Sequence, residues 1–127
     1  MSWLLDTSVV VCLGEGNFDI IRQVEALAAT PAISALTRVE LEAGVFRAPL
    51  EIETRRARLD ATRETLEILP FNNAAAAHYG RKLTDTGFSR RQIFDQMTAA
   101  HAISGGYALV SMNEADFQSV SELSLLA

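Results

Sequence analysis

The chain has 127 residues, 49% hydrophobic and 21% charged, which excludes a disordered polymer and predicts one folded domain spanning residues 1–127. Its formal charge of −5 excludes binding of nucleic acid through bulk positive charge, although it leaves room for an enzyme that acts on nucleic acid. One cysteine, Cys12, excludes an intrachain disulfide and a cysteine zinc cluster, and no apolar run reaches the ~20 residues of a membrane span, so we expect a cytoplasmic location.

The first part of the chain alternates short apolar runs with helical patterns. A strand is predicted at residues 3–5, a short apolar run followed by a polar cluster, and a second short strand at 31–34. The helical spacings and their breakers predict helices at residues 9–13, 18–29 and 35–46.

The second part of the chain continues this alternation. A long charged helix is predicted at 50–67, and the later elements are a strand at 68–70, helices at 74–86 and 89–103, a strand at 107–110, a turn at 116–117 and an apolar run at 123–126. This order predicts an α/β fold with a short central parallel sheet flanked by helices on both faces.

Four polar residues are candidates for a shared site. Asp6 and Asn113 directly follow predicted strands, and parallel sheets gather such residues at their carboxyl edge. Glu40 and Asp95 are expected in the first turns of helices that can point to the same edge. Carboxylate oxygens favour Mg²⁺ or Mn²⁺ over zinc, and phosphodiester hydrolysis is the natural reaction of such a site.

Each acid also has a purely structural interpretation. Thr37 and Glu40 have the spacing of a helix capping box. Asp95 lies early in its helix, where the helix dipole favours any acid, and Asp6 can form a turn after its strand. Taken one at a time, these acids leave both interpretations open.

The residues around the acids form four motifs in order. These are LLDTSV at 4–9, ELEAG at 40–44, FDQMTAAHA at 94–102 and LVSMNEADF at 109–117. The chain resembles PIN-domain proteins, and specifically the VapC-type toxins of bacterial toxin–antitoxin pairs. That resemblance implies a Mg²⁺-dependent endoribonuclease, with Mn²⁺ as a possible substitute, that cleaves RNA, forms a homodimer and is held inactive by a cognate VapB-type antitoxin.

The resemblance also implies roles for individual acids. Asp6 and Asp95 match the principal metal-binding aspartates of the family. Glu40 matches the glutamate of its Glu-Leu-x-x-Gly motif, and is expected to reach the metal through water or to orient the nucleophile as a base.

The last motif implies supporting roles around these acids. Ser111 matches a frequent threonine, and the fourth acidic position of the family falls on Asn113, an amide that can only hydrogen-bond there. Ser8 and Asn113 are expected to support the metal ligands, and Asp116 is a possible substitute for the missing charge.

Basic residues near the predicted site are candidates for contacts with RNA phosphates. The closest in sequence to Asp95 are Arg81, Lys82, Arg90 and Arg91. A second group on the long charged helix, which is more often a solvated face, consists of Arg55, Arg56, Arg58 and Arg63. His78 and His101 lack metal-ligand spacing and are interpreted as structural histidines.

Other folds with similar features fit less well. A phosphorylation receiver needs an acidic pair after its first strand and a lysine after its last, whereas Lys82 is the only lysine. A haloacid-dehalogenase-type phosphatase needs an aspartate at Ser8, and a dinucleotide fold needs a third glycine after Gly16. A different class of function stays open: a catalytically weakened PIN-like module that binds RNA or a partner without turnover.

Overall fold

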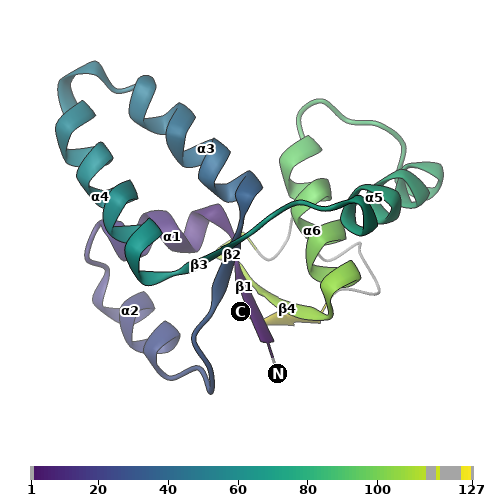
Figure 1. Cartoon of the computed structure of the whole chain (residues 1–127), viewed down its shortest axis with the longest axis horizontal. Helices are drawn as coiled ribbons and strands as arrows, with labels where there is room; N and C mark the ends of the chain where they lie inside the picture. Colours follow the sequence, from purple (N-terminus) through teal and green to yellow (C-terminus); the bar gives the residue numbers. More distant parts are fainter. Residues whose placement is uncertain (1, 114–116, 118–123, 127) are drawn as a thin grey trace.

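A computed structural model describes residues 2–113, 117 and 124–126 (Figure 1). The elements in chain order are β1 (Ser2–Leu5), α1 (Thr7–Gly14), α2 (Phe18–Glu25), β2 (Ala32–Ser34), α3 (Ala35–Phe46), the 3-10 turn η1 (Pro49–Glu51), α4 (Ile52–Thr65), β3 (Glu67–Leu69), α5 (Asn73–Thr86), α6 (Ile93–Gly105), β4 (Tyr107–Val110) and β5 (Ser124–Leu126). The predicted alternation of strands and helices is confirmed. None of the helices in these residues is long and apolar enough to cross a membrane.

The strands form one parallel sheet in the order β3-β2-β1-β4-β5. Leu4 of β1 pairs with Ala32 of β2 on one side and with Leu109 of β4 on the other. After β1, the chain therefore adds β2 and β3 on one side of β1, and then β4 and β5 on the other side. Sheets of this kind bind ligands beyond the carboxyl ends of the strands, at the point where the strand order reverses. In this chain that point lies between β1 and β4.

Helices cover both faces of the sheet, as predicted. Consecutive strand residues point to opposite faces, so Leu4 and Leu5, both fully buried, belong to different core clusters. Leu4 packs with Ala99 of α6 and Leu5 packs with Val9 of α1. Figure 1 shows the corresponding layers, with α1 and α2 on one side of the sheet and α5 and α6 on the other.

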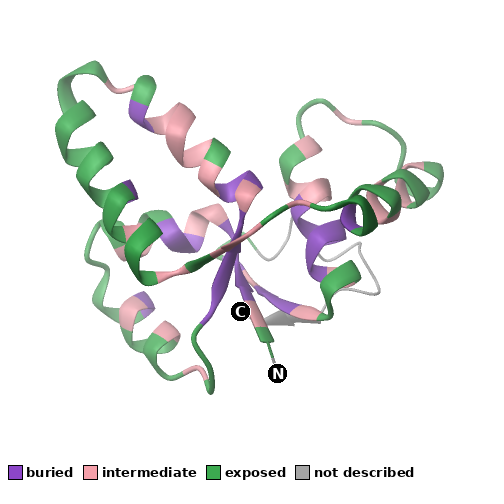
Figure 2. Ribbon diagram, in the orientation of Figure 1, coloured by how far each residue is buried: buried purple, intermediate pink, exposed green. Residues whose placement is uncertain are grey.

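The hairpin formed by α3 and α4 projects away from the sheet. The predicted helix at 50–67 is divided, because Pro49 begins the short turn η1 and α4 starts only at Ile52. Leu59 is the buried residue of α4 in this hairpin, and Figure 2 shows the rest of α4 largely exposed.

Several predicted helix boundaries are wrong, among them the start of α1, the end of α2 and the start of α6. α1 begins at Thr7, two residues early, because Asp6 caps it. α2 ends at Glu25, four residues before the predicted end, with Ala26 as its C-terminal cap. α6 begins at Ile93, because the Ser89 hydroxyl accepts from the Gln92 N–H at 3.3 Å and closes a turn instead of starting the helix.

Candidate functional site

Asp6 lies at the switch point of the sheet. β1 ends at Leu5, so the next residue leaves the sheet at its carboxyl edge, and the Asp6 side chain is only 4% exposed. Its Oδ1 accepts from the Thr7 N–H at 2.8 Å, which caps α1. Its Oδ2 accepts from the Ser8 hydroxyl at 3.1 Å and from the Ser111 hydroxyl at 2.8 Å. The side chain is therefore oriented from both β1–α1 and the end of β4.

The segment after β4 is held against the first helix. The Met112 N–H donates to the Ser8 hydroxyl at 3.1 Å, and the Asn113 N–H donates to the Ser111 hydroxyl at 3.0 Å. Asn113 thus contributes through its backbone, and its exposed side-chain amide remains the predicted fourth site position. Asp116, the predicted substitute, lies outside the described residues.

Glu40 does not cap its helix. α3 begins at Ala35, and its cap is Ser34, whose hydroxyl accepts from the Leu36 N–H at 3.1 Å. Glu40 therefore lies in the second turn of α3, so both the first-turn placement and the capping-box alternative are wrong. The predicted helix at 35–46 is confirmed, and Thr37 is a fully buried residue inside it rather than its cap.

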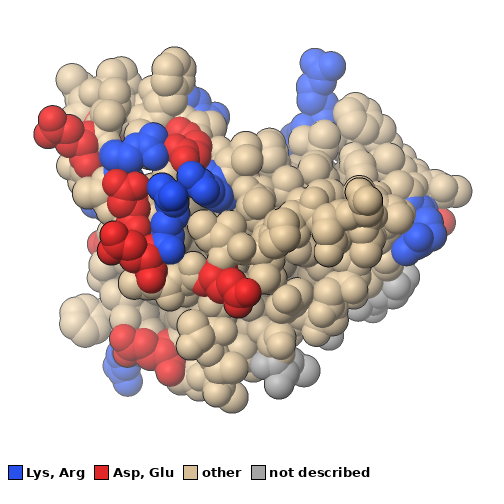
Figure 3. Space-filling model, viewed as in Figure 1, with Lys and Arg blue, Asp and Glu red and all other residues tan. Residues whose placement is uncertain are grey.

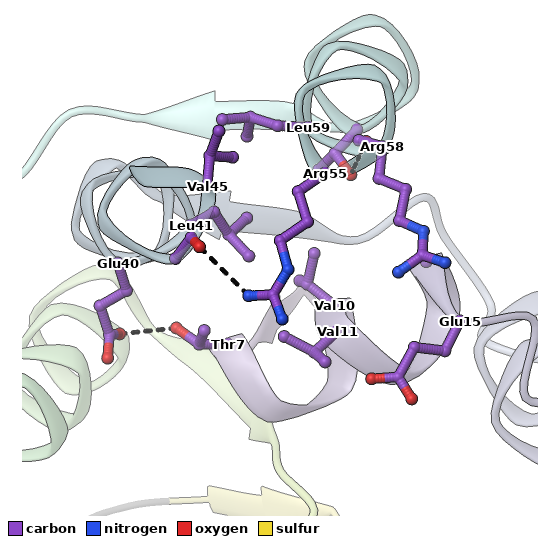
Figure 4. Close-up of a pocket in the computed structure, with 13 residues that line it drawn as sticks. Thr7, Val10, Val11, Glu15, Glu40, Leu41, Val45, Arg55, Arg58 and Leu59 are labelled. Carbon is purple, nitrogen blue, oxygen red and sulfur yellow. Dashed lines mark hydrogen bonds between the residues drawn. The ribbon is translucent and has the colours of Figure 1, made fainter. Parts of the chain in front are cut away.

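Two threonines, which the sequence analysis missed, connect Glu40 to the first helix. The Thr7 hydroxyl donates to Glu40 Oε1 at 2.6 Å (Figure 4). The Thr7 and Thr37 hydroxyls are 3.3 Å apart. Because the single Thr7 proton is used on Glu40, Thr37 is the donor in the second contact. The only signal for this chain of hydroxyls was the position of Thr7 beside Asp6 and of Thr37 one helical turn before Glu40.

The electrostatic environment of Glu40 favours a nearby cation. Burial raises the pKa of Glu40 above its ordinary value, and the negative charge of Asp6 raises it further. The hydrogen bond from Thr7 and the charge of Arg47 oppose this rise without cancelling it. The negative charges of Asp6 and Glu40 therefore interact unfavourably, and a bound cation would relieve that repulsion.

Asp95 belongs to the α5–α6 layer, on the face of the sheet opposite α1. It is the acid in the first turn of α6, half-buried, and α6 is joined to β4 through the single residue Gly106. Because the helix returns antiparallel to the strands, its first turn points toward the carboxyl edge (Figure 1). A favourable interaction with the helix dipole is also present at this position, so that interpretation of Asp95 stands beside the functional one.

The oxygen donors of this edge fit Mg²⁺ better than a metal that needs a complete protein cage. Mg²⁺ keeps several waters and is commonly held by one or two carboxylates. Asp6 and Glu40 supply hard oxygen donors in a region of negative potential. Among the described residues, no group of three or more His, Cys, Asp or Glu side chains is arranged to hold a metal ion.

A groove adjoins Glu40 between α1, α3 and α4, with a cavity volume of about 170 Å³. Figure 4 shows Thr7 and Glu40 at one end and Glu15 and Arg58 at the other. Arg55 donates to the Gly44 carbonyl at 3.1 Å, which braces α4 against α3. The apolar part of the wall consists of Val10, Val11, Leu41, Val45 and Leu59.

The two predicted groups of basic residues differ in their surroundings. On α4, Arg55, Arg56 and Arg63 form ion pairs with Glu51, Glu42 and Asp60. Arg90 and Arg91 are exposed in the turn before α6, and Arg81 lies on α5 with a nitrogen 3.2 Å from His78 Nδ1. Figure 3 shows the mixed charges over α3 and α4, and a surface hollowed between that hairpin and the α5–α6 side.

Comparison with known proteins agrees with this arrangement. The family model described as the PIN domain matches residues 3–123. Ribonuclease VapC1 of Rickettsia felis is 28% identical over 132 residues, covering 99% of this chain and 96% of that protein. The tRNA(fMet)-specific endonuclease VapC of Shigella flexneri is 31% identical over 93 residues, covering 72% of this chain and 70% of that protein.

A solved structure extends the similarity to three dimensions. The structure of VapBC2 from Rickettsia felis, bound to a DNA fragment from the promoter, matches with a TM-score of 0.87 and 27% identity, covering 99% of this chain and 98% of that chain. The motifs at 4–9, 40–44, 94–102 and 109–117 all fall within the matched range. The chain therefore belongs to the PIN-domain family, as a VapC-type toxin of VapBC toxin–antitoxin systems.

Proposed function

We propose that this VapC-type ribonuclease toxin is a Mg²⁺-dependent endoribonuclease that hydrolyses RNA phosphodiester bonds. The observation that carries the proposal is the buried Asp6 carboxylate, oriented by Ser8 and Ser111 beside a Glu40 whose pKa is raised. The relatives named as a ribonuclease and a tRNA(fMet)-specific endonuclease support the same reaction class.

The residues of the proposed site have different roles in this reaction. Mg²⁺, when bound, supplies positive charge for the phosphate oxygens and makes water a better nucleophile. Asp6 and Asp95 hold the ion, and Ser8 and Ser111 keep Asp6 in one orientation. Glu40 orients the attacking water and accepts its proton, a role for which a raised carboxylate pKa is an advantage near neutral pH.

RNA binding is proposed to use the basic residues on the α6 side. Arg90 and Arg91 are exposed in the turn that precedes the Asp95 helix, and Arg81 lies on the neighbouring α5. Their guanidinium groups are suited to phosphate oxygens. Arg55, Arg56 and Arg63 of α4 already pair with acids on the surface, which makes them weaker candidates.

The proposed partners are a VapB-type antitoxin and a second copy of the chain. The groove beside Glu40 has apolar walls and an acidic end, and so suits an antitoxin segment that places an arginine near the carboxylates. The similarity to VapBC2, solved as a toxin–antitoxin complex, supports the antitoxin. The homodimer rests on the family resemblance alone.

A nuclease assay on the purified protein tests the enzyme proposal. We expect RNA cleavage that requires Mg²⁺ or Mn²⁺, stops with EDTA and falls at least about 100-fold in Asp6→Asn and in Asp95→Asn, because a lost metal ligand removes several kcal/mol of transition-state stabilisation. Asp85→Asn, an exposed acid on α5, is the matched control and should cleave normally. Cleavage that persists in both variants, or without a divalent cation, would contradict the proposal.

The second candidate, a weakened binding module, is favoured by the amide at Asn113. If it holds, RNA or antitoxin binds with equal affinity in EDTA and in Mg²⁺, and no cleavage follows. Asn113→Asp distinguishes the two functions. A nuclease with an incomplete charge set should bind Mn²⁺ more tightly and cleave faster in this variant, whereas a binding module should gain no activity.

A further inference from the structure

A buried hydrogen bond links two parts of the chain that each lead to a proposed site acid. His101 of α6 places its Nδ1 2.8 Å from the hydroxyl oxygen of Ser34, the last residue of β2. Ser34 is fully buried and His101 is 4% exposed, although they are 67 positions apart in the sequence. A polar pair buried this deeply is costly unless its hydrogen bond is made, so the contact constrains both segments.

The protonation state of the pair follows from its neighbours. The Ser34 hydroxyl oxygen accepts from the Leu36 N–H, which leaves its proton free to donate to His101 Nδ1. Burial lowers the pKa of His101, in agreement with a neutral ring that accepts at Nδ1. Phe71 and Tyr107 contact the ring edge-on, with centroids 5.6 and 6.5 Å away. The ring is therefore held in place as well as hydrogen-bonded.

The two acids lie at the same number of residues from the two members of this hydrogen bond. Glu40 follows Ser34 by six residues along α3, and Asp95 precedes His101 by six residues along α6. At 1.5 Å per residue, each acid lies about 9 Å along its own helix from the contact. α3 begins directly after Ser34, and α6 runs from Asp95 toward His101, so the two acids lie at equal distances along their helices from the contact.

We propose that the Ser34–His101 hydrogen bond sets the separation of α3 and α6, and thereby makes both residues positioning residues for Glu40 and Asp95. The catalytic meaning of that separation rests on the proposed nuclease function, whereas the separation itself does not. Because a displacement of about 1 Å can reduce a rate 100-fold, a fixed distance between the two acids matters to a metal-dependent reaction.

Spin labels on the two helices measure this separation directly. Val39 and Phe94 are exposed and adjacent to Glu40 and Asp95, so Val39→Cys and Phe94→Cys, in a Cys12→Ser background, report the distance by pulsed electron paramagnetic resonance. His101→Phe keeps a ring between Phe71 and Tyr107 but removes the acceptor. His101→Asn keeps a hydrogen-bonding atom close to the position of Nδ1.

The proposal expects a broadened or shifted distance distribution in His101→Phe and a distribution close to wild type in His101→Asn. Ser104→Ala is the matched control, because the Ser104 hydroxyl bonds only within α6, to the His101 carbonyl at 3.2 Å. Should His101→Phe fail to fold, Ser34→Ala removes the same contact from the other side. A folded His101→Phe or Ser34→Ala protein with the wild-type distribution would overturn the proposal.

Steady-state kinetics on RNA then separate this inference from the proposed function. We expect kcat to fall about 10- to 100-fold in His101→Phe, with KM unchanged and recovery in His101→Asn. A loss of thermal stability alone, with normal kcat and spin-label distances, would mean that the pair is only structural and would contradict the proposal. Absence of nuclease activity in the wild type would refute the proposed function, and the distance measurement would still decide the inference.

Discussion

At the residue scale, the Glu40 carboxylate combines burial with a nearby like charge. Burial and Asp6 both raise its pKa, while Thr7 and Arg47 lower it less. The folded protein therefore holds this proton at pH values at which the unfolded chain has already released it. Stability from this group is fully present below the ordinary glutamate pKa and is lost as the pH rises through the folded pKa.

The raised pKa of Glu40 leads to a prediction for Glu40→Gln. The variant should unfold at a higher temperature than wild type at pH 7, because it lacks the buried charge, and the difference should vanish below the ordinary glutamate pKa. Thermal unfolding followed by circular dichroism across this pH range measures the effect. Mg²⁺ should raise the unfolding temperature of wild type more than that of the variant, whereas an equal rise in both would argue against a cation beside Glu40.

At the element scale, a hydroxyl of α1 orients the acid of α3. Removing it in Thr7→Val leaves a half-buried carboxylate without its closest donor, so we expect kcat for RNA cleavage to fall about 10- to 100-fold. Thr7→Ser keeps the hydroxyl and should retain most activity. Thr62→Val is the control, since that hydroxyl donates to the Arg58 carbonyl of its own helix. Equal activity in Thr7→Val and Thr7→Ser would show that the contact does not serve the reaction.

The same scale explains which helix features were predictable. Asn72 caps α5 by accepting from the Ala75 N–H, a contact within three residues that a local pattern can indicate. The start of α3 at residue 35 was predicted, but its cap is Ser34 and not Thr37, the residue that the alternative capping box used. Burial of Thr37 against other elements decides between them, and no local pattern carries that information.

At the scale of the whole molecule, an acidic chain is proposed to bind an acidic substrate. The net charge of −5 predicts weak non-specific attraction, so local cations must supply most of the electrostatic binding of RNA. Because each phosphate contact contributes about 0.7 to the slope of log K against log salt for a single strand, Arg90→Ala with Arg91→Ala should reduce that slope by about 1.4.

Filter binding in Ca²⁺ at several salt concentrations measures this slope without cleavage. Arg56→Ala is the matched control, since Arg56 pairs with Glu42 at 2.7 Å on the α3–α4 hairpin. The salt slope of this variant should equal that of wild type. A slope unaffected by the Arg90 and Arg91 changes would mean that RNA binds elsewhere on the molecule.

The sequence by itself determined the order of strands and helices, the family motifs, and the positions of Asp6 after the first strand and Asp95 in the first turn of α6. Those features depend on local periodicity and capping. Only the tertiary structure decided that Ser111 donates to Asp6, Thr7 to Glu40 and Ser34 to His101, over 105, 33 and 67 positions. These contacts require β4 to pair beside β1 and α6 to pack near the end of β2. Strand order and helix packing arise from burial of the whole core, which no local sequence pattern specifies.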